Sequence, residues 1–146
     1  MVDENLTVNQ IPRWFEGVSL NFAENMLFSR ARSDPVAHRG TVNKEDDKVA
    51  MTEVREGGCE VRNVTYGELR RRAGRLAAAM KARGVVKGDR VVLVAANSVE
   101  TLVVLLATAW LGAIFSSSST DMGVKGILQR AVQVNPKVCM SFMSRA

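Results

Sequence analysis

The sequence predicts an α/β fold: an incomplete parallel βαβαβ sheet unit, preceded by a β-hairpin and an N-terminal arm. Three short apolar runs alternate with two longer segments of helical periodicity, which is typical of strands joined by helical crossovers. Such crossovers between parallel strands are right-handed, so the three strands should form one sheet. The apolar runs lie at 90–95, 113–115 and 138–142, and the helical segments at 98–111 and 123–134.

The composition is that of a soluble globular protein. The chain has 146 residues, of which 47% are apolar and 24% charged. Three Pro, eleven Gly and two Cys exclude collagen-like and disulfide-rich classes. Cys59 and Cys139 lack metal-site spacing and indicate either a reducing compartment or two structural thiols. His38 is the single histidine, which excludes a His-rich metal site.

The N-terminal arm, residues 1–40, is irregular in pattern. Residues 21–32 are compatible with a short helix that carries Phe22 and Met26 on one side. The helix should end before Pro35, because the residue ahead of a proline avoids the helical region. We expect the arm to pack its aromatic side chains onto a larger body. These aromatics include Trp14, Phe15, Phe22 and Phe28.

A hairpin and a helix should follow the arm. Two weakly alternating stretches, 49–54 and 60–64, flank a Glu-Gly-Gly turn and predict a β-hairpin. A helix is predicted over 66–83, because Thr65 and Glu68 form a T-x-x-E capping box ahead of apolar residues at helical spacing. Gly84 is a natural left-handed stop for this helix.

The sheet unit begins with a continuous β-branched run at 90–95, which favours a parallel strand buried on both faces. Asn97 or Ser98 should cap the next helix, which is apolar nearly all round and therefore deeply buried. After the second strand we expect a polar loop over 116–122. The helix at 123–134 should then have one apolar face, formed by Val124, Ile127, Leu128 and Ala131.

The charge and hydropathy patterns limit the kinds of partner that the protein can have. Eight Lys and Arg residues lie between Arg70 and Arg90 against Asp89 alone, a pattern that can indicate nucleic-acid binding. Their helical spacing between apolar residues is more typical of a solvated helix face, so we expect no nucleic-acid partner. The uncharged stretch 101–120 ends in four serines and has too short an apolar core to span a bilayer. The N-terminus has no signal-peptide pattern, so we expect a cytoplasmic protein without a membrane span.

Ligands of doubly wound sheets bind at the carboxyl ends of the strands, but the loops expected there carry no glycine-rich phosphate motif. Hydroxyls at 116–121 could contact phosphate, although a polar loop that caps the next helix is the simpler interpretation. A Ser-His-Asp catalytic triad is not convincing either, because the single histidine, His38, lies in the arm and nothing in the sequence places it near a serine. We interpret Asp89 as a turn residue and Asp121 as a helix cap, not as paired acid–base carboxylates. We therefore assign no catalytic, cofactor-binding or metal-binding residue.

Several motifs resemble those of adenylate-forming enzymes, and in particular acyl-CoA synthetases of the acetyl-CoA and acetoacetyl-CoA type. The stretch L-G-A-I-F-S-S-S-S-T-D-M-G-V is similar to the acetoacetyl-CoA form, although Thr120 stands where proline is usual. Together with the L-N-F-A-E-N arm, it indicates acetoacetate as the substrate. The other matches are W-F-E-G at 14–17, T-Y-G-E-L at 65–69, G-V at 84–85 with K-G-D-R-V at 87–91, and N-P-K-V at 135–138.

The resemblance implies a two-step ligase. A carboxylate attacks the α-phosphate of ATP to give an acyl-adenylate, and the thiol of coenzyme A then displaces AMP. Mg²⁺ and cationic donors stabilise the charge at the phosphates. The family supplies these donors from a Ser/Thr/Gly-rich loop, an adenine-binding motif and a lysine of a mobile C-terminal domain, none of which occurs in residues 1–146.

We therefore expect the N-terminal portion of such a ligase, inactive by itself, with none of ATP, Mg²⁺ and coenzyme A bound well. Residues 1–40 would be the arm, and residues 41–146 the first part of the AMP-binding domain. One alternative is a non-catalytic module that binds a partner synthetase chain, or another copy of itself, through an unpaired sheet edge. Another is a small nucleotide-binding domain.

Overall fold

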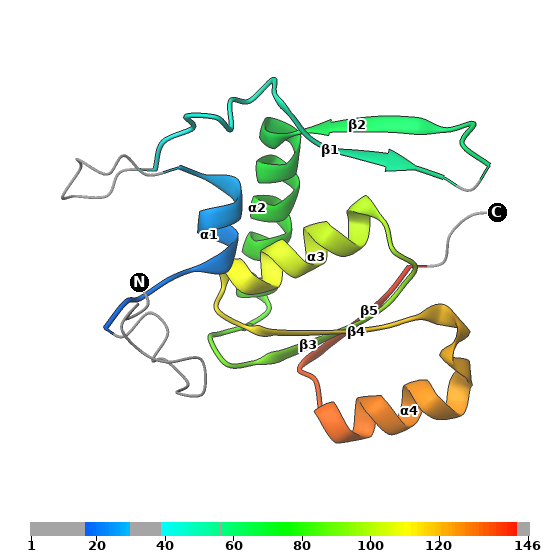
Figure 1. Cartoon of the computed structure of the whole chain (residues 1–146). Coiled ribbons are helices and arrows are strands. Elements are labelled where there is room, and N and C mark those ends of the chain that lie inside the picture. Colours follow the sequence, from blue (N-terminus) through cyan, green and yellow to red (C-terminus); the bar gives the residue numbers. More distant parts are fainter. Residues whose placement is uncertain (1–16, 30–38, 56, 143–146) are drawn as a thin grey trace, which may run out of the picture.

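The computed structural model describes residues 17–29, 39–55 and 57–142. The helices are α1 (Phe22–Leu27), α2 (Tyr66–Ala82), α3 (Val99–Trp110) and α4 (Gly123–Val134), with a 3₁₀ turn η1 (Thr120–Met122). The strands are β1 (Val49–Val54), β2 (Val61–Thr65), β3 (Arg90–Val94), β4 (Ile114–Ser118) and β5 (Val138–Ser141). In Figure 1, α2 and α3 lie on one side of the β3–β5 sheet and α4 lies on the other.

The three C-terminal strands form the predicted parallel sheet, in the order β4-β3-β5. Val92 of the central strand lies opposite Ser116 on one side and Cys139 on the other. Val91, Val92 and Leu93 are at most 2% exposed, which confirms a strand buried on both faces. The βαβαβ order predicted from the sequence is therefore confirmed.

The predicted hairpin is present as a separate two-stranded sheet. Strands β1 and β2 pair antiparallel, with Val54 opposite Val61 at the turn end. Gly57 and Gly58 have φ values of +83° and +68°, a backbone conformation that glycine adopts without the usual Cβ clash. The hairpin lies at the N-terminal end of α2 (Figure 1), and β2 leads directly into that helix.

Helix α2 follows the sequence prediction closely. The hydroxyl of Thr65 accepts a hydrogen bond from the Glu68 amide at 3.2 Å, which is the first half of the predicted capping box. The Glu68 carboxylate accepts instead from Arg62 at 2.7 Å and from Arg72. The helix ends at Ala82, and Gly84 takes the left-handed conformation with φ +82°.

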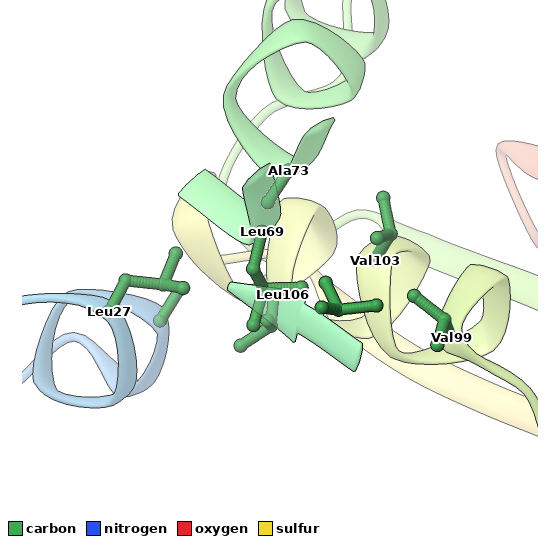
Figure 2. Close-up of a cluster of buried hydrophobic side chains, with 8 residues drawn as sticks. Leu27, Leu69, Ala73, Val99, Val103 and Leu106 are labelled. Atoms are coloured by element: carbon green, nitrogen blue, oxygen red, sulfur yellow. The ribbon is translucent and has the colours of Figure 1, made fainter. Parts of the chain in front are cut away.

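The core has two parts, one on each side of the α2–α3 pair. In the first, Leu27 of α1 meets Leu69 of α2 and Leu106 of α3, and all three are at most 4% exposed (Figure 2). The second lies between these helices and the sheet, where Met80 and Val104 pack with Leu93. Helices α2 and α3 therefore form a layer with apolar contacts on both sides.

The arm packs on this layer with a different face from the one expected. Helix α1 buries Ala23 and Leu27, whereas Phe22 and Met26 are 55% and 50% exposed. The reason is a contact distant in sequence: the side-chain amide of Asn21 donates to the carbonyls of Ala109 and Trp110 and fixes the rotation of α1. Of the arm's aromatics, Phe28 meets the Trp110 ring edge-on at 5.9 Å, whereas Trp14 and Phe15 lie outside the described residues.

The basic helix is only partly the solvated face that the sequence favours. Arg71, Arg75, Lys81 and Arg83 are exposed, as expected. The side chain of Arg70 is 10% exposed and donates to the carbonyls of Leu27 and Lys44 and to the Asp46 carboxylate. Arg70 therefore holds the end of α1 and the 44–46 segment against α2, because a guanidinium can serve several acceptors at once.

Candidate functional site

The carboxyl ends of the parallel strands form the candidate functional site, because ligands of open α/β sheets bind there. The Ala95 amide donates to the carbonyl of Ser118 at 3.2 Å, and the Phe142 amide donates to the carbonyl of Val94 at 3.2 Å. These bonds hold the three strand ends level at one edge of the sheet. The segments that leave this edge are 95–98, 119–122 and the chain after Ser141.

The serine tetrad stands at this edge, but mostly as strand and not as the polar loop expected over 116–122. Ser116, Ser117 and Ser118 belong to β4 and lie opposite Val92, Leu93 and Val94. The central strand presents unpaired amides and carbonyls along this length, and pairing with β4 satisfies them. Ser118 is only 7% exposed. The hydroxyls after the strand are therefore those of Ser119 and Thr120.

The start of α3 already has an acidic partner. The Ser98 hydroxyl accepts from the Thr101 amide at 3.3 Å, so Ser98 and not Asn97 is the cap. The carboxylate of Glu53, from the hairpin, accepts from the Val99 amide at 3.1 Å. A helix N-terminus attracts anions, and here a side chain supplies the negative charge. The sequence did not reveal Glu53, because 46 positions separate it from Val99.

A group of charged residues next to this helix start joins the hairpin to both long helices. Glu100 accepts from Arg72 at 2.8 Å and lies 4.0 Å from Arg62. Partial burial raises the pKa of Glu100, but the hydrogen bond from Arg72, a backbone amide and the charges of Arg72 and Arg62 outweigh it, so the net pKa is lowered. These side chains are paired with one another, which is the pattern of a structural brace.

The two aspartates considered from the sequence lie at opposite ends of the sheet unit. Asp89 precedes β3 and accepts from the Val86 amide at 2.8 Å, which confirms a turn residue. That bond and the ion pair with Lys137 lower the pKa of Asp89. Asp121 follows β4 within η1, and α4 has no side-chain cap, so the expectation that Asp121 caps this helix is wrong. Parallel strands keep the two carboxylates apart, so they cannot act as an acid–base pair.

The remaining polar groups and the apolar helices bear on metal and membrane roles. Within 17–29, 39–55 and 57–142, no three His, Cys, Asp or Glu side chains gather as a metal site would require. Cys59 and Cys139 are both free and exposed, so they are not buried structural thiols, and His38 lies outside the described residues. None of the described helices has the length and apolar character needed to cross a membrane, and the apolar stretch within 101–120 is largely the twelve-residue α3.

The site therefore offers backbone groups and hydroxyls at the strand ends. Ser119 and Thr120 can donate hydrogen bonds to a bound ligand. A phosphate group would also need cationic donors, yet Arg62 and Arg72 are committed to carboxylates. The exposed Arg130 of α4, which donates to the Ser117 carbonyl at 3.3 Å, is a further cation close to the end of β4.

Comparison with known proteins identifies relatives along most of the chain. The family model described as AMP-binding enzyme matches residues 39–145. The acetoacetyl-CoA synthetase of Rattus norvegicus is 42% identical over 141 residues, which are 97% of this chain and 19% of the relative. Malonamoyl-CoA synthetase vrtB of Penicillium aethiopicum is 39% identical over 94% of this chain and 18% of its own length.

The fold matches as well. The structure of acetoacetyl-CoA synthetase from Streptomyces lividans superimposes with a TM-score of 0.73 and 36% identity, and covers 89% of this chain and 18% of its own. The chain thus spans about a fifth of the length of the curated relatives that it matches, or 19% for the rat protein.

Proposed function

The chain belongs to the AMP-binding enzyme family, and from this premise we propose that it is the N-terminal part of an ATP-dependent acyl-CoA ligase. The proposed ligase activates acetoacetate to acetoacetyl-CoA through an acyl-adenylate. The observation that carries the proposal is the 42% identity to an acetoacetyl-CoA synthetase over 97% of the chain. The β4–η1–α4 segment supports it, because the motif that resembles the acetoacetyl-CoA form lies there, at the ligand-binding edge of the sheet.

In this proposal the described residues are scaffold for the reaction. Strand β3 and its neighbours bring Ser119 and Thr120 to the edge where a ligand would lie. Glu53 and Ser98 fix the start of α3 next to that edge. ATP would be the co-substrate with Mg²⁺, and coenzyme A the acceptor of the acyl group. Their charged groups would be held by residues other than those described, with acetoacetate as the small-molecule substrate.

The direct test is a chimeric enzyme. The region of rat acetoacetyl-CoA synthetase that aligns with this chain is replaced by residues 1–146, and acetoacetate-dependent exchange of pyrophosphate into ATP is measured. The proposal expects exchange within about tenfold of the parent, because a scaffold exchange that preserves packing costs about 1.4 kcal/mol or less. A folded chimera that exchanges pyrophosphate with another short acid but not with acetoacetate would contradict the proposed substrate.

The 146-residue chain alone is the matched control. It should give no exchange above background with acetoacetate, ATP and Mg²⁺, because residues 1–146 contain no Ser/Thr/Gly-rich phosphate loop of the family's kind. Exchange by the purified chain would show that it carries a complete adenylation site. It would overturn the scaffolding role while leaving the family assignment intact.

Two further points of the proposal concern compartment and partners. We propose that the protein works in the cytoplasm, since the free and exposed thiols of Cys59 and Cys139 suit a reducing environment.

The second candidate function is a non-catalytic module that binds a synthetase chain or a second copy of itself. It is favoured by β4 and β5, each of which pairs on one side only in the described sheet. A monomer at high concentration in sedimentation would count against it.

A further inference from the structure

An open groove lies between α2 and the C-terminal end of α3, at the amino ends of strands β3 and β4. Lys87 precedes β3 and Leu111 precedes β4, and both residues line the groove. The candidate functional site lies at the carboxyl ends of the same strands, so the groove is a separate surface. Its volume is about 690 Å³, within the range of about 300–1,000 Å³ that is usual for small-molecule sites.

Most of the groove wall is apolar. Helix α2 contributes small residues, which leave room for an occupant, and the other apolar lining residues include Val85, Trp110 and Leu111. At one of the small residues, Gly74, an added Cβ would lie 3.9 Å from Cη2 of Trp110, so the indole ring faces α2 at this point. An apolar occupant that displaces water from this wall gains free energy by the hydrophobic effect.

Two ammonium groups give the groove a charge preference. Lys81 and Lys87 line it, and both are exposed. In the described part of the chain neither lysine makes an ion pair, and the nearby Asp89 pairs with Lys137 instead. Residues 69–88 contain no Asp or Glu, so no acidic side chain of this segment offsets the two positive charges. The groove therefore attracts an anion.

The apolar and charged parts of the groove lie apart along α2. The Trp110 ring lies at Gly74, and Lys81 follows seven residues later, which corresponds to about 10.5 Å along a helix axis. An occupant that lies along α2 would meet the indole ring at one end and an ammonium group at the other. This arrangement suits a molecule with an apolar chain and an anionic head.

We propose that the groove binds a free long-chain fatty acid in its carboxylate form. The alkyl chain covers Trp110 and the small residues of α2, and the carboxylate lies at Lys81 and Lys87. A stable protein partner would cover about 20–30 residues, whereas nine residues line the groove, so its size favours a small molecule. This inference is independent of the proposed function, because it concerns the opposite end of the sheet.

Dodecanoate tests the proposal in the 146-residue chain, with Trp110 as the reporter. In a Trp14→Phe background, Trp110 is the only remaining tryptophan. We expect a saturable blue shift of its fluorescence below the critical micelle concentration, and binding at least about tenfold weaker for octanoate, because its chain is shorter. Dodecyltrimethylammonium has the same chain and the opposite head charge, and it should bind at least about fivefold more weakly. Equal affinities for the anionic and cationic amphiphiles would overturn the proposal.

A pair of variants with the same change in net charge places the binding in the groove. Ala78 and Ala79 are both exposed on α2, but only Ala78 lines the groove. Ala78→Glu should weaken dodecanoate binding at least about tenfold, because its carboxylate competes for Lys81 at the i+3 position. Ala79→Glu should bind dodecanoate within about twofold of the wild type. Equal losses in the two variants would contradict binding in the groove.

The comparison of amphiphiles uses no α2 variant, so it stays decisive if Ala78→Glu destabilises the fold. Other occupants would give different results, and each of these would overturn the proposal. A response to vesicles containing phosphatidylglycerol, with none to dodecanoate, would assign the groove to a membrane surface. A blue shift that depends on protein concentration and not on dodecanoate would assign it to a second copy of the chain. The absence of both a fluorescence change and a heat of binding with dodecanoate would leave the groove without this ligand.

Discussion

Helices α3 and α4 invite direct comparison. Each has twelve residues, each follows a strand of the same parallel sheet, and they lie on opposite sides of it (Figure 1). Helix α3 buries six residues, whereas α4 buries none. Leu106 of α3 is 1% exposed, and Leu128 of α4 is 59% exposed.

The difference shows that an apolar pattern and burial are separate properties. The sequence correctly places both helices, but α3 packs beside α2, with α1 on one side of this pair and the sheet on the other. Helix α4 contacts β3 and η1, and Val124 and Val132 are more than 70% exposed. Burial requires a second layer, which, of these two helices, only α3 has among the described residues. The free energy of folding of the described chain should therefore depend on the α3 side of the sheet.

The largest expected effect comes from truncating one leucine on each of the two helices. Leu106→Ala should lower the free energy of unfolding by about 3 kcal/mol, because truncation of this side chain leaves a cavity next to Leu27 and Leu69. Leu128→Ala should lower it by less than about 0.5 kcal/mol, because that side chain is mostly in water. The midpoints of urea unfolding measure both. Similar losses for the two variants would mean that α4 is buried against something in solution, and the contrast would fail.

Two arginines extend the contrast to polar contacts. Arg70→Gln should lower the free energy of unfolding by about 2 kcal/mol, because the guanidinium, in a side chain only 10% exposed, serves the carbonyls of Leu27 and Lys44 and the Asp46 carboxylate. Arg130 on α4 is exposed and makes one contact of 3.3 Å to the Ser117 carbonyl. Arg130→Gln should change the free energy by less than about 0.5 kcal/mol. Thermal melting by circular dichroism measures both, and a larger effect at Arg130 would reverse the ranking.

Helix caps give a smaller difference of the same sign. Ser98→Ala should cost about 1 kcal/mol, because the Thr101 amide loses its side-chain acceptor at the start of α3. Ser119→Ala, before η1, should cost less than about 0.3 kcal/mol, since Ser119 makes no capping bond. Hydrogen exchange of the first-turn amides of α3 provides a local check. If the Ser98 variant exchanged like the wild type, the cap would not stabilise α3.

The sequence was most informative where the decisive interactions are local. The cap at Thr65 and the stop at Gly84 lie within or beside α2, and the prediction of that helix is confirmed to within a residue. It failed where a distant residue decides the structure. Asn21 selects the buried face of α1 through carbonyls 88 and 89 positions away. Nothing in the arm's own periodicity could reveal that contact.

The candidate site shows the same limit. Ser116–Ser118 have the composition of a loop, but β3 offers them a ladder of backbone hydrogen bonds that composition cannot reveal. Glu53 reaches the α3 start only because the hairpin folds over it. The place of the site at the strand ends was predictable from the βαβ order, since topology alone fixes it. The side chains that occupy that place required the structure.

The smallest expected effect concerns pH and the charged brace beside α3. Because the pKa of Glu100 is lowered in the folded protein, its ionised form contributes stability that is present above the unfolded pKa and is lost as the pH falls through the folded value. Glu100 is 41% exposed, so solvent screening limits the contribution to less than about 0.5 kcal/mol. Between pH 5 and 3, the loss of unfolding free energy should therefore be slightly shallower in Glu100→Gln than in the wild type. A steeper profile in Glu100→Gln would mean that Arg72 and Arg62 do not favour the ionised carboxylate, and the brace would then not distinguish the α3 side from the α4 side.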